Sequence, residues 1–490
     1  MMNSRKGTLP LLKELHKMGR RGPQVPVSGL EDRPISEILP KEFLREEPLS
    51  MPELSEVEVV RHFVNLSNLN YGVDNGFYPL GSCTMKYNPK INEEVAAWFQ
   101  DIHPALPENR VQPLLELLYT LQQDLLEITG MDAITLQPAA GAHGELTSLL
   151  MAKAYFKDHG LLEKDTVIIP DSAHGTNPAS ATMAGFKVVT VKSDEEGLVD
   201  LEQLKTLVND HTAVFMLTNP NTLGKFEKNI LGIAQLIHGV GGLMYCDGAN
   251  LNGMLGWARP GDMGFDFVHL NLHKTFSTPH GGGGPGSGPV AVKKALEPFL
   301  PKPVLVKAED EDGDGSYHWD YDRPRSIGKV RSNFGNILVA LKALAYIKSL
   351  GGAGLREVGT MAVLNANYMR VAMEDTLPTA YPGLCKHEYV ATAEEVKKRY
   401  GVKAQDIAKR LLDKGFHAPT MYFPLIVKEA LMIEPTETET KENLDAFVQA
   451  IKEIVEEAAT NPDVVLSAPH DTPVRRLDEV KANKELKVRW

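Results

Sequence analysis

The chain has 490 residues, 43% hydrophobic and 24% charged, which is enough for two packed domains of an ordinary globular protein. Its 52 basic and 64 acidic residues give a formal net charge of −12, and no long basic run stands out. Nucleic acid and anionic membrane surfaces are therefore excluded as expected partners, because both need a clustered cationic face.

Cysteine usage and the N-terminus predict a cytoplasmic protein. Cys83, Cys246 and Cys385 are the only cysteines, and no CxxC pair occurs, so neither a disulfide framework nor a thiolate metal site is expected. The N-terminus is basic, but its longest apolar stretch (9–12) is too short for a signal sequence. No stretch approaches the roughly 20 apolar residues of a membrane span.

Residues 1–110 are rich in proline and asparagine and show weak periodicity. We expect them to form an N-terminal arm that packs on another surface rather than a domain of its own. Leucines then recur at helical spacing, which predicts a helix over 113–129.

Short apolar runs alternate with helical patterns through the region 111–325, which we predict to be a large ligand-binding domain. The expected strands are 166–169, 187–191, 213–217, 243–246, 267–270 and 289–292, with helices such as 146–156, 201–208 and 230–238 between them. This alternation indicates an α/β fold with a mainly parallel sheet covered on both faces. Such a sheet binds ligands in a crevice at the carboxyl ends of its strands.

An acidic stretch over 308–324 breaks this pattern. It begins like a calcium loop at Asp310, but Tyr321 stands at the twelfth position, where a bidentate glutamate belongs, so we expect a solvated loop. Helices are predicted over 336–350 and 355–373, and a region of alternating character follows at 415–427, 431–433 and 441–458. We assign 326–490 to a smaller C-terminal α/β domain.

Two residues at predicted strand ends carry the main chemical signal. Lys274 follows the strand 267–270, where an amine shielded from water can attack a cofactor aldehyde. Asp247 ends the strand 243–246, 27 residues earlier, so its carboxylate is expected in the same crevice. Pyridoxal phosphate needs such a lysine, and it needs an anion beside its pyridine nitrogen. Either residue alone is more often structural, but together they form a specific pair.

Two further motifs have places in such a site. Small residues in the run from Gly141 to Gly144 open a predicted helix, whose N-terminus favours a phosphate. His174 follows the strand 166–169, where a flat imidazole could stack on a pyridine ring. The four-glycine run 281–284 matches no dinucleotide fingerprint, because Pro285 follows it and no GxGxxG enters a helix.

Several longer strings resemble those of one family, the glycine-cleavage P-proteins, or glycine dehydrogenases (aminomethyl-transferring). They are SAHGTNPASA (172–181), DGAN (247–250), NLHKTF (271–276) and PHGGGGPG (279–286), with shorter matches at 83–86, 102–104, 417–421 and 434–437. The matches span from about residue 83 to residue 439. The chain resembles the C-terminal half of the longer family members, which is subunit 2 where the protein is split.

The resemblance implies a fold and a set of site residues. The fold is the fold-type-I pyridoxal phosphate architecture, similar to aspartate aminotransferase. Lys274 would bond to the cofactor aldehyde, Asp247 would pair with the ring nitrogen, and His174 would stack on the ring. The phosphate would be held by Gly141, Ala142, His143, Gly144 and Thr275. No metal is implied.

The resemblance also implies an activity and partners. Glycine would lose CO2, and its aminomethyl group would pass to the lipoyl disulfide of H-protein, in a complex with P-protein subunit 1, with two copies of each subunit expected. Lys86, His103 and His273 are candidates for shaping the pocket or moving protons. Two alternatives remain: another fold-type-I decarboxylase or aminotransferase, and a non-catalytic subunit that keeps the fold.

Overall fold

The computed structural model describes residues 8–24, 26, 28–29, 31–47, 49–103, 105–281, 284, 286–308 and 315–486. It divides into two compact units. One contains Met1–Asn75 with Pro469–Trp490, and the other contains Gly76–Ala468. The boundaries proposed from the sequence, at 110 and 325, stay predictions.

The first unit is built from short helices that bury little surface. Its longest helix, α2 (Glu56–Ser67), begins where the Ser55 backbone N–H donates to Glu58 Oε2 at 2.9 Å, and none of its side chains is buried. Val57 and Phe63 are each 53% exposed. The other elements are η1 (Leu12–Leu15), α1 (Ile35–Ile38), η2 (Lys41–Phe43) and α14 (Glu479–Lys484). This unit therefore leaves apolar side chains open to solvent.

The second unit contains a seven-stranded sheet. Its strands are β1 (Ala133–Thr135), β2 (Thr166–Pro170), β3 (Lys187–Val191), β4 (Thr212–Thr218), β5 (Leu243–Gly248), β6 (Phe267–Leu270) and β7 (Val290–Val292), in the order β1-β7-β6-β5-β4-β2-β3. β6, β5, β4, β2 and β3 run parallel, whereas β7 is antiparallel to both β6 and β1. The predicted mainly parallel sheet is confirmed; the short strand β1 was not predicted.

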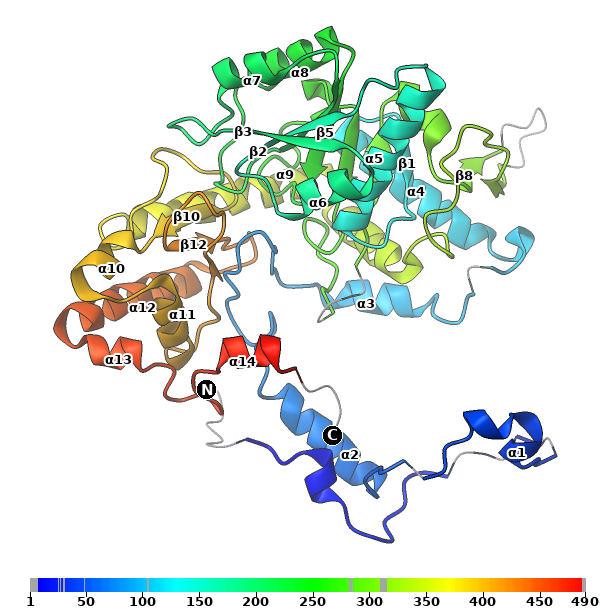
Figure 1. Cartoon of the computed structure of the whole chain (residues 1–490), viewed down its shortest axis with the longest axis vertical. Helices are drawn as coiled ribbons and strands as arrows, with labels where there is room; N and C mark the ends of the chain where they lie inside the picture. Colours follow the sequence, from blue (N-terminus) through cyan, green and yellow to red (C-terminus); the bar gives the residue numbers. More distant parts are fainter. Residues whose placement is uncertain are drawn as a thin grey trace. The chain divides into compact units, whose positions relative to one another are not determined.

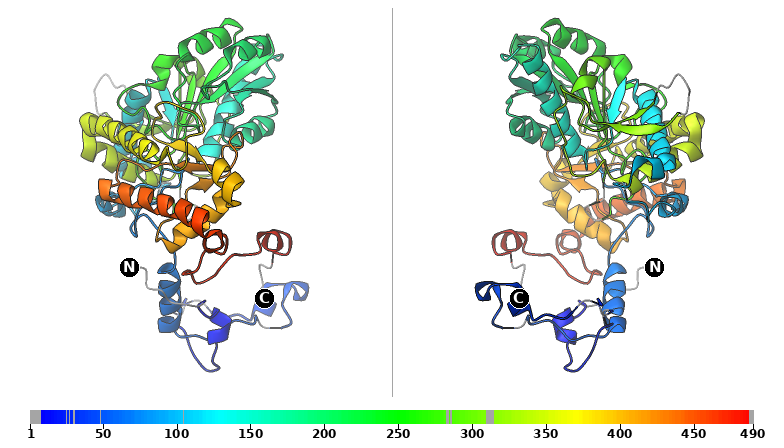
Figure 2. Two further views of the ribbon diagram at one scale, coloured as in Figure 1. Left: turned by 90° about the vertical axis from the view of Figure 1, so that its left-hand side faces the viewer. Right: turned by 90° about the vertical axis from the view of Figure 1, so that its right-hand side faces the viewer.

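Helices cover both faces of this sheet (Figures 1 and 2). The alternating side chains of β4 show why: Val214 and Met216 pack into one apolar cluster, and Phe215 and Leu217 pack into another on the opposite face. The first cluster includes side chains of α5 (Gly141–Asp158) and α6 (Thr176–Met183). The second includes side chains of α4 (Gln112–Thr129), α7 (Leu201–Leu207) and α8 (Ile230–Gly239). Continuous apolar strands are what a sheet buried on both faces requires.

A smaller sheet follows in the chain. β10 (Tyr389–Thr392) and β11 (Thr420–Met421) each pair antiparallel with β12 (Ala430–Ile433). Four helices belong to this part: α10 (Glu394–Tyr400), α11 (Ala404–Asp413), α12 (Lys441–Thr460) and α13 (Pro462–Leu466). Their apolar side chains form a separate core around Phe447 and Ile451. The large sheet domain with a smaller α/β part is the fold class that the sequence predicts.

α9 (Ile337–Met373) links the two cores. The sequence predicts two helices here, and α9 indeed consists of two helical segments that meet at a kink at Gly351, whose φ of 61° is not helical. By length and composition α9 alone among the described helices could cross a membrane. Its side chains Leu341 and Leu344 are nevertheless buried in one protein core and Met369 in the other, which is the behaviour of a core helix.

The remaining elements are short. α3 (Lys90–Ala97) packs against α9, and η3 (Glu108–Arg110) precedes α4. η4 (Pro260–Met263) and η5 (Lys294–Phe299) flank the strands β6 and β7. β8 (Val304–Lys307) pairs antiparallel with β9 (Tyr317–Asp320), which lies in the acidic stretch where the sequence indicated no strand. Residues 310–314, the first part of the calcium-like segment, lie outside the described residues.

We predict that Gly288→Ala disturbs the start of α5. A Cβ atom at this position would lie 2.1 Å from the carbonyl oxygen of Ala140, so the backbone must shift. We expect the free energy of unfolding to fall by about 1–3 kcal/mol in urea titrations. The matched control is Gly232→Ala on α8, where nothing lies within 4 Å and a gain of about 0.5–1 kcal/mol is expected. Equal effects in the two variants would contradict this account.

Candidate functional site

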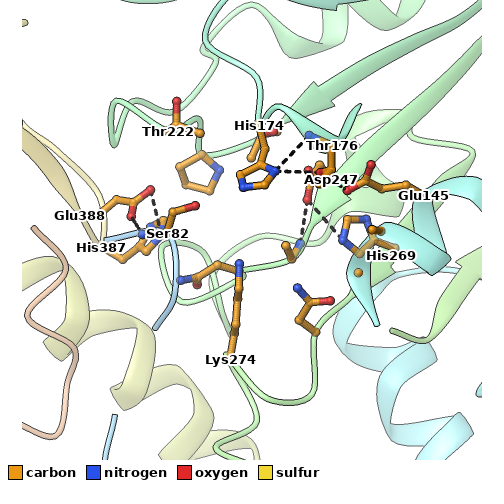
Figure 3. Close-up of a pocket in the computed structure, with 17 residues that line it drawn as sticks. Ser82, Glu145, His174, Thr176, Thr222, Asp247, His269, Lys274, His387 and Glu388 are labelled. Atoms are coloured by element: carbon orange, nitrogen blue, oxygen red, sulfur yellow. Dashed lines mark hydrogen bonds and ion pairs between the residues drawn. The ribbon is translucent and has the colours of Figure 1, made fainter. Parts of the chain in front are cut away.

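A pocket of about 130 Å³ opens at the carboxyl ends of β4, β5 and β6. It is lined by Ser82, Gly141, Ala142, Glu145, His174, Thr176, Thr218, Pro220, Thr222, Asp247, Ala249, Asn250, His269, Asn271, Lys274, His387 and Glu388. Figure 3 shows Asp247 on one side and Glu388 on the other, with His174 and Lys274 between them. Five predicted site residues thus meet in one place: Lys274, Asp247, His174, Gly141 and Ala142.

Asp247 is 3% exposed at the end of β5. Its Oδ2 accepts a hydrogen bond from Asn177 Nδ2 at 3.0 Å, and its Oδ1 accepts one from the Ala249 N–H at 3.1 Å. His269 Nε2 lies 3.4 Å from Oδ1. Burial alone raises the pKa of Asp247, but His269, these donors and Lys274 outweigh it, so the pKa falls below its usual value. The carboxylate is therefore charged at neutral pH.

A second layer fixes His269 behind Asp247. The two residues are Cα partners of the parallel strands β5 and β6, which places their side chains on the same face. The His269 Nδ1 atom contacts the hydroxyl of Tyr245, which is fully buried. The buried row of Tyr245, His269 and Asp247 therefore holds the carboxylate in one orientation.

Lys274 lies in the loop after β6, half buried, and its backbone N–H donates to the Asn271 carbonyl at 3.0 Å. The loop is supported from below by Lys86, which donates from Nζ to the Thr275 carbonyl and to Glu437 Oε1, both at 2.7 Å. Although burial lowers the pKa of Lys86, Glu437 more than compensates and the pKa is raised. The buried pair anchors the backbone next to Lys274.

The other side of the pocket combines a helix start with an imidazole. α5 begins at Gly141 and Ala142, and the first N–H groups of a helix lack intrahelical partners, which suits a phosphate. His174 is exposed to the pocket, and its Nδ1 accepts a hydrogen bond from the Thr176 N–H at 3.2 Å. Its ring is therefore held in place with room to stack on a planar ligand.

Buried atoms without partners show that the pocket fits a polar ligand. Among the described residues, Thr218 Oγ1, Asn271 Oδ1 and His387 Nδ1 are buried and make no hydrogen bond, although their residues line the pocket. Unpaired buried polar atoms cost free energy and often mark the place of a ligand. An amine, a charged carboxylate, a helix N-terminus and an imidazole are together the groups that pyridoxal phosphate requires.

Three predicted phosphate-binding residues do not line the pocket. Gly144 is buried against the strands, since a Cβ there would lie 2.9 Å from the Gly288 carbonyl oxygen. His143 Nδ1 accepts a hydrogen bond from the Ala139 N–H at 3.1 Å. Thr275 Oγ1 accepts one from the Leu251 N–H at 2.8 Å. These contacts order the backbone around the site, and a direct phosphate contact by these residues stays a prediction.

The structure also shows where the three weaker candidates, Lys86, His103 and His273, lie. Lys86 lies beneath the site, as described, and His103 lines a separate surface pocket with Arg331. His273 packs edge-on against His280, with ring centroids 5.2 Å apart, and burial lowers the pKa of His273 to about 3. Of the glycine-rich run that follows, Gly282, Gly283 and Pro285 lie outside the described residues.

Sequence reasoning missed several lining residues. His269 could have been noticed as a lone polar side chain in the apolar strand 267–270. Ser82 comes from the segment before α3, and His387 and Glu388 come from the chain just before β10. Their distance in sequence from Lys274 left no local signal, because only the tertiary fold brings these segments together.

Comparison with known proteins identifies the family. The chain is 57% identical over 482 residues to the probable glycine dehydrogenase (decarboxylating) subunit 2 of Caldanaerobacter subterraneus subsp. tengcongensis, covering 98% of each chain. The corresponding protein of Thermosipho africanus is 58% identical over 474 residues, covering 96% of this chain and 97% of that one. The chain belongs to the glycine dehydrogenase (decarboxylating) subunit 2 family.

Family models and solved structures agree with this assignment. Residues 358–472 match the glycine dehydrogenase C-terminal domain, and residues 143–306 match the class-V aminotransferases. A glycine decarboxylase (P-protein) of the glycine cleavage system, solved with an inhibitor, superposes with a TM-score of 0.72 at 22% identity, over 86% of this chain and 94% of that one. A NifS-like protein gives a TM-score of 0.60 at 16% identity, over 78% and 99%. The cofactor of this chain is pyridoxal phosphate, as in the class-V aminotransferases.

We predict that Glu437→Ala destabilises the protein. The change leaves the buried Lys86 ammonium without its carboxylate, which costs about 3–5 kcal/mol. Urea unfolding followed by circular dichroism measures the loss. The control is Glu196→Ala, which removes the partner of the exposed Lys228 and should leave the midpoint unchanged. An unchanged midpoint for Glu437→Ala would refute the anchoring role of the pair.

Proposed function

We propose that the chain decarboxylates glycine and transfers the remaining aminomethyl group to the lipoyl disulfide of H-protein, as part of the glycine cleavage system. The observation that carries the proposal is the shared pocket of Lys274 and the charged Asp247 in a member of the subunit 2 family. Bound pyridoxal phosphate supplies an aldehyde that bonds to an amine and a ring that accepts the electron pair released with CO2.

Asp247 keeps a negative charge beside the ring nitrogen. His269, Asn177 and the Ala249 N–H hold the carboxylate in its charged form, so it stabilises a proton on the pyridine nitrogen. A protonated ring attracts electrons more strongly than a neutral one. Because the network is buried, water does not screen this interaction.

The remaining pocket residues hold and orient the cofactor and glycine. The Lys274 amine, which lines the pocket, would hold the cofactor through its aldehyde. The N–H groups of Gly141 and Ala142 would hold the phosphate and His174 would lie against the ring, which would leave the end of the pocket that contains Glu388 for glycine. Formally the reaction is an oxidation, with the lipoyl disulfide as electron acceptor and no nicotinamide.

We propose that the chain works in the cytoplasm with subunit 1, two copies of each. The name of its relatives, subunit 2, supports a partner subunit. Within the first compact unit, α2 exposes Val57, Val60, Phe63 and Val64 by about half each, which is the surface expected of an interface. The three cysteines are free, consistent with a reducing compartment.

Removal of the amine tests the proposal. Lys274→Ala should lose the visible absorbance of the bound cofactor, and exchange of labelled CO2 with the glycine carboxyl should fall to background, because nothing then anchors the aldehyde. The assay contains the co-purified partner subunit and lipoylated H-protein. If the rate of CO2 release were the same with and without H-protein, another amino-acid decarboxylase activity would be favoured instead.

The matched control is Lys348→Ala, which removes a surface lysine whose Nζ lies 2.8 Å from Asp124. It should keep both the absorbance and the exchange of wild type. Exchange retained in Lys274→Ala would overturn the assignment.

A further inference from the structure

Two buried carboxyl groups stand at the end of the pocket opposite Asp247. Glu388 directly precedes β10 and Glu434 directly follows β12. These strands pair antiparallel with Tyr389 opposite Ile433, so the next residues outward, Glu388 and Glu434, face each other. They are 4% and 0% exposed, and their carboxylate oxygens lie within 4.8 Å of each other. Only Glu388 lines the pocket.

The two carboxyl groups accept different numbers of hydrogen bonds, so one holds a proton more readily than the other. Glu434 accepts three hydrogen bonds, from Thr84 N at 3.0 Å, Thr84 Oγ1 at 2.8 Å and Asn250 Nδ2 at 2.7 Å. Glu388 accepts one, from Ser82 N at 2.7 Å, and His387 Nε2 lies 3.8 Å away, beyond hydrogen-bond distance. Bonds donated to a carboxylate favour its charged form. Burial raises the pKa of both carboxyls, to about 8 for Glu388 and to about 7 for Glu434, so the proton resides mainly on Glu388 and the charge mainly on Glu434.

The titratable groups around Glu388 come from three segments. Burial raises the pKa of Glu388, and the nearby charge of Glu434 raises it further, while the hydrogen bond from the Ser82 N–H and the charge of Lys274 oppose both. The thiol of Cys83, on the segment that includes Ser82, has a pKa raised by burial and stays neutral. Burial lowers the pKa of His387 to about 3, so this imidazole is neutral at pH 7 and its remaining N–H is a very weak acid. Glu388 is then the group at this end that holds a transferable proton at neutral pH.

The transfer reaction needs such a proton. When the carbon left by CO2 bonds to one sulfur of the lipoyl disulfide, the S–S bond breaks and the other sulfur departs with the electron pair as a thiolate. A thiol forms only when this sulfur gains a proton, so each turnover consumes one. The disulfide is reduced and the glycine carbon is oxidised, and no further redox partner is required.

We propose that Glu388 is the general acid that protonates the departing lipoyl sulfur. This inference rests on the proposed function. The other carboxyls lining the pocket are engaged at its far end, where Asp247 accepts hydrogen bonds from Asn177 and the Ala249 N–H, and Glu145 accepts hydrogen bonds from Thr176 and Ser180. After the transfer Glu388 is charged beside Glu434, and this repulsion favours recovery of the proton from solvent.

The direct test follows thiol formation from glycine and lipoylated H-protein by the holoenzyme with its partner subunit. Glu388→Gln keeps the size of the side chain and the acceptor for Ser82 N, but it has no acidic proton. We expect thiol formation to slow by about 10²–10⁴-fold, while the cofactor absorbance and its change on adding glycine remain. The control is Glu227→Gln, which replaces a buried glutamate outside the pocket and should behave as wild type.

A pH profile and an infrared measurement separate acid catalysis from a structural role. The rate of thiol formation by wild type should be highest below the pKa of Glu388 and should fall as pH rises through that pKa. For Glu388→Gln the rate should be low and should not depend on pH. Glu434→Gln removes the neighbouring charge, so the wild-type fall should move to lower pH. The infrared difference between wild type and Glu388→Gln, taken without cofactor at pH 7, should contain the band of a protonated carboxyl.

Different failures have different meanings. If the wild-type holoenzyme forms no thiol from glycine and lipoylated H-protein, the proposed function falls, and the role of Glu388 falls with it. If wild type forms thiol but Glu388→Gln matches its rate and pH profile, only the role of Glu388 is overturned. An infrared difference that shows only a carboxylate band would likewise overturn it.

Discussion

The site depends on one constraint: a carboxylate must stay charged inside the protein. Burial of Asp247 opposes this, and the surrounding donors reverse the effect. Neighbouring parallel strands make the arrangement possible, because β5 supplies Asp247 while β6 supplies His269 and leads into the Lys274 loop. The fold thereby places an acid and an amine at one sheet edge, although the two residues are not neighbours in the sequence.

The pocket has two acidic ends that differ in protonation, and the difference follows from hydrogen bonding. Asp247 accepts bonds from two donors beside a histidine and stays charged. Glu388 accepts one bond next to the charged Glu434 and keeps a proton. Two carboxyls with separated pKa values are suited to separate tasks, one to electrostatic stabilisation and the other to proton transfer.

Much of the fold could be predicted from the sequence, and so could part of the site. Apolar strands of the large sheet and the residues Lys274, Asp247 and His174 could be predicted, because each follows from local periodicity or from a strand end. Glu388 and Ser82 could not, because they reach the pocket through antiparallel pairing of β10 with β12 and through a segment that packs on β12. The family resemblance implied that Thr275 holds the phosphate; its hydroxyl oxygen accepts a hydrogen bond from the Leu251 N–H, and the phosphate contact stays a prediction. Residue type alone does not determine the direction in which a side chain points in a tight loop.

The protonation state of the cofactor ring tests the central claim most directly. Pyridoxal phosphate labelled with nitrogen-15 in the ring should, in the holoenzyme, give the nuclear magnetic resonance shift of a protonated pyridine that is bonded to a carboxylate. Asp247→Asn should bind the cofactor but return the nitrogen to its unprotonated shift, with most turnover lost. An unprotonated ring in wild type, or the same shift in both proteins, would contradict the account.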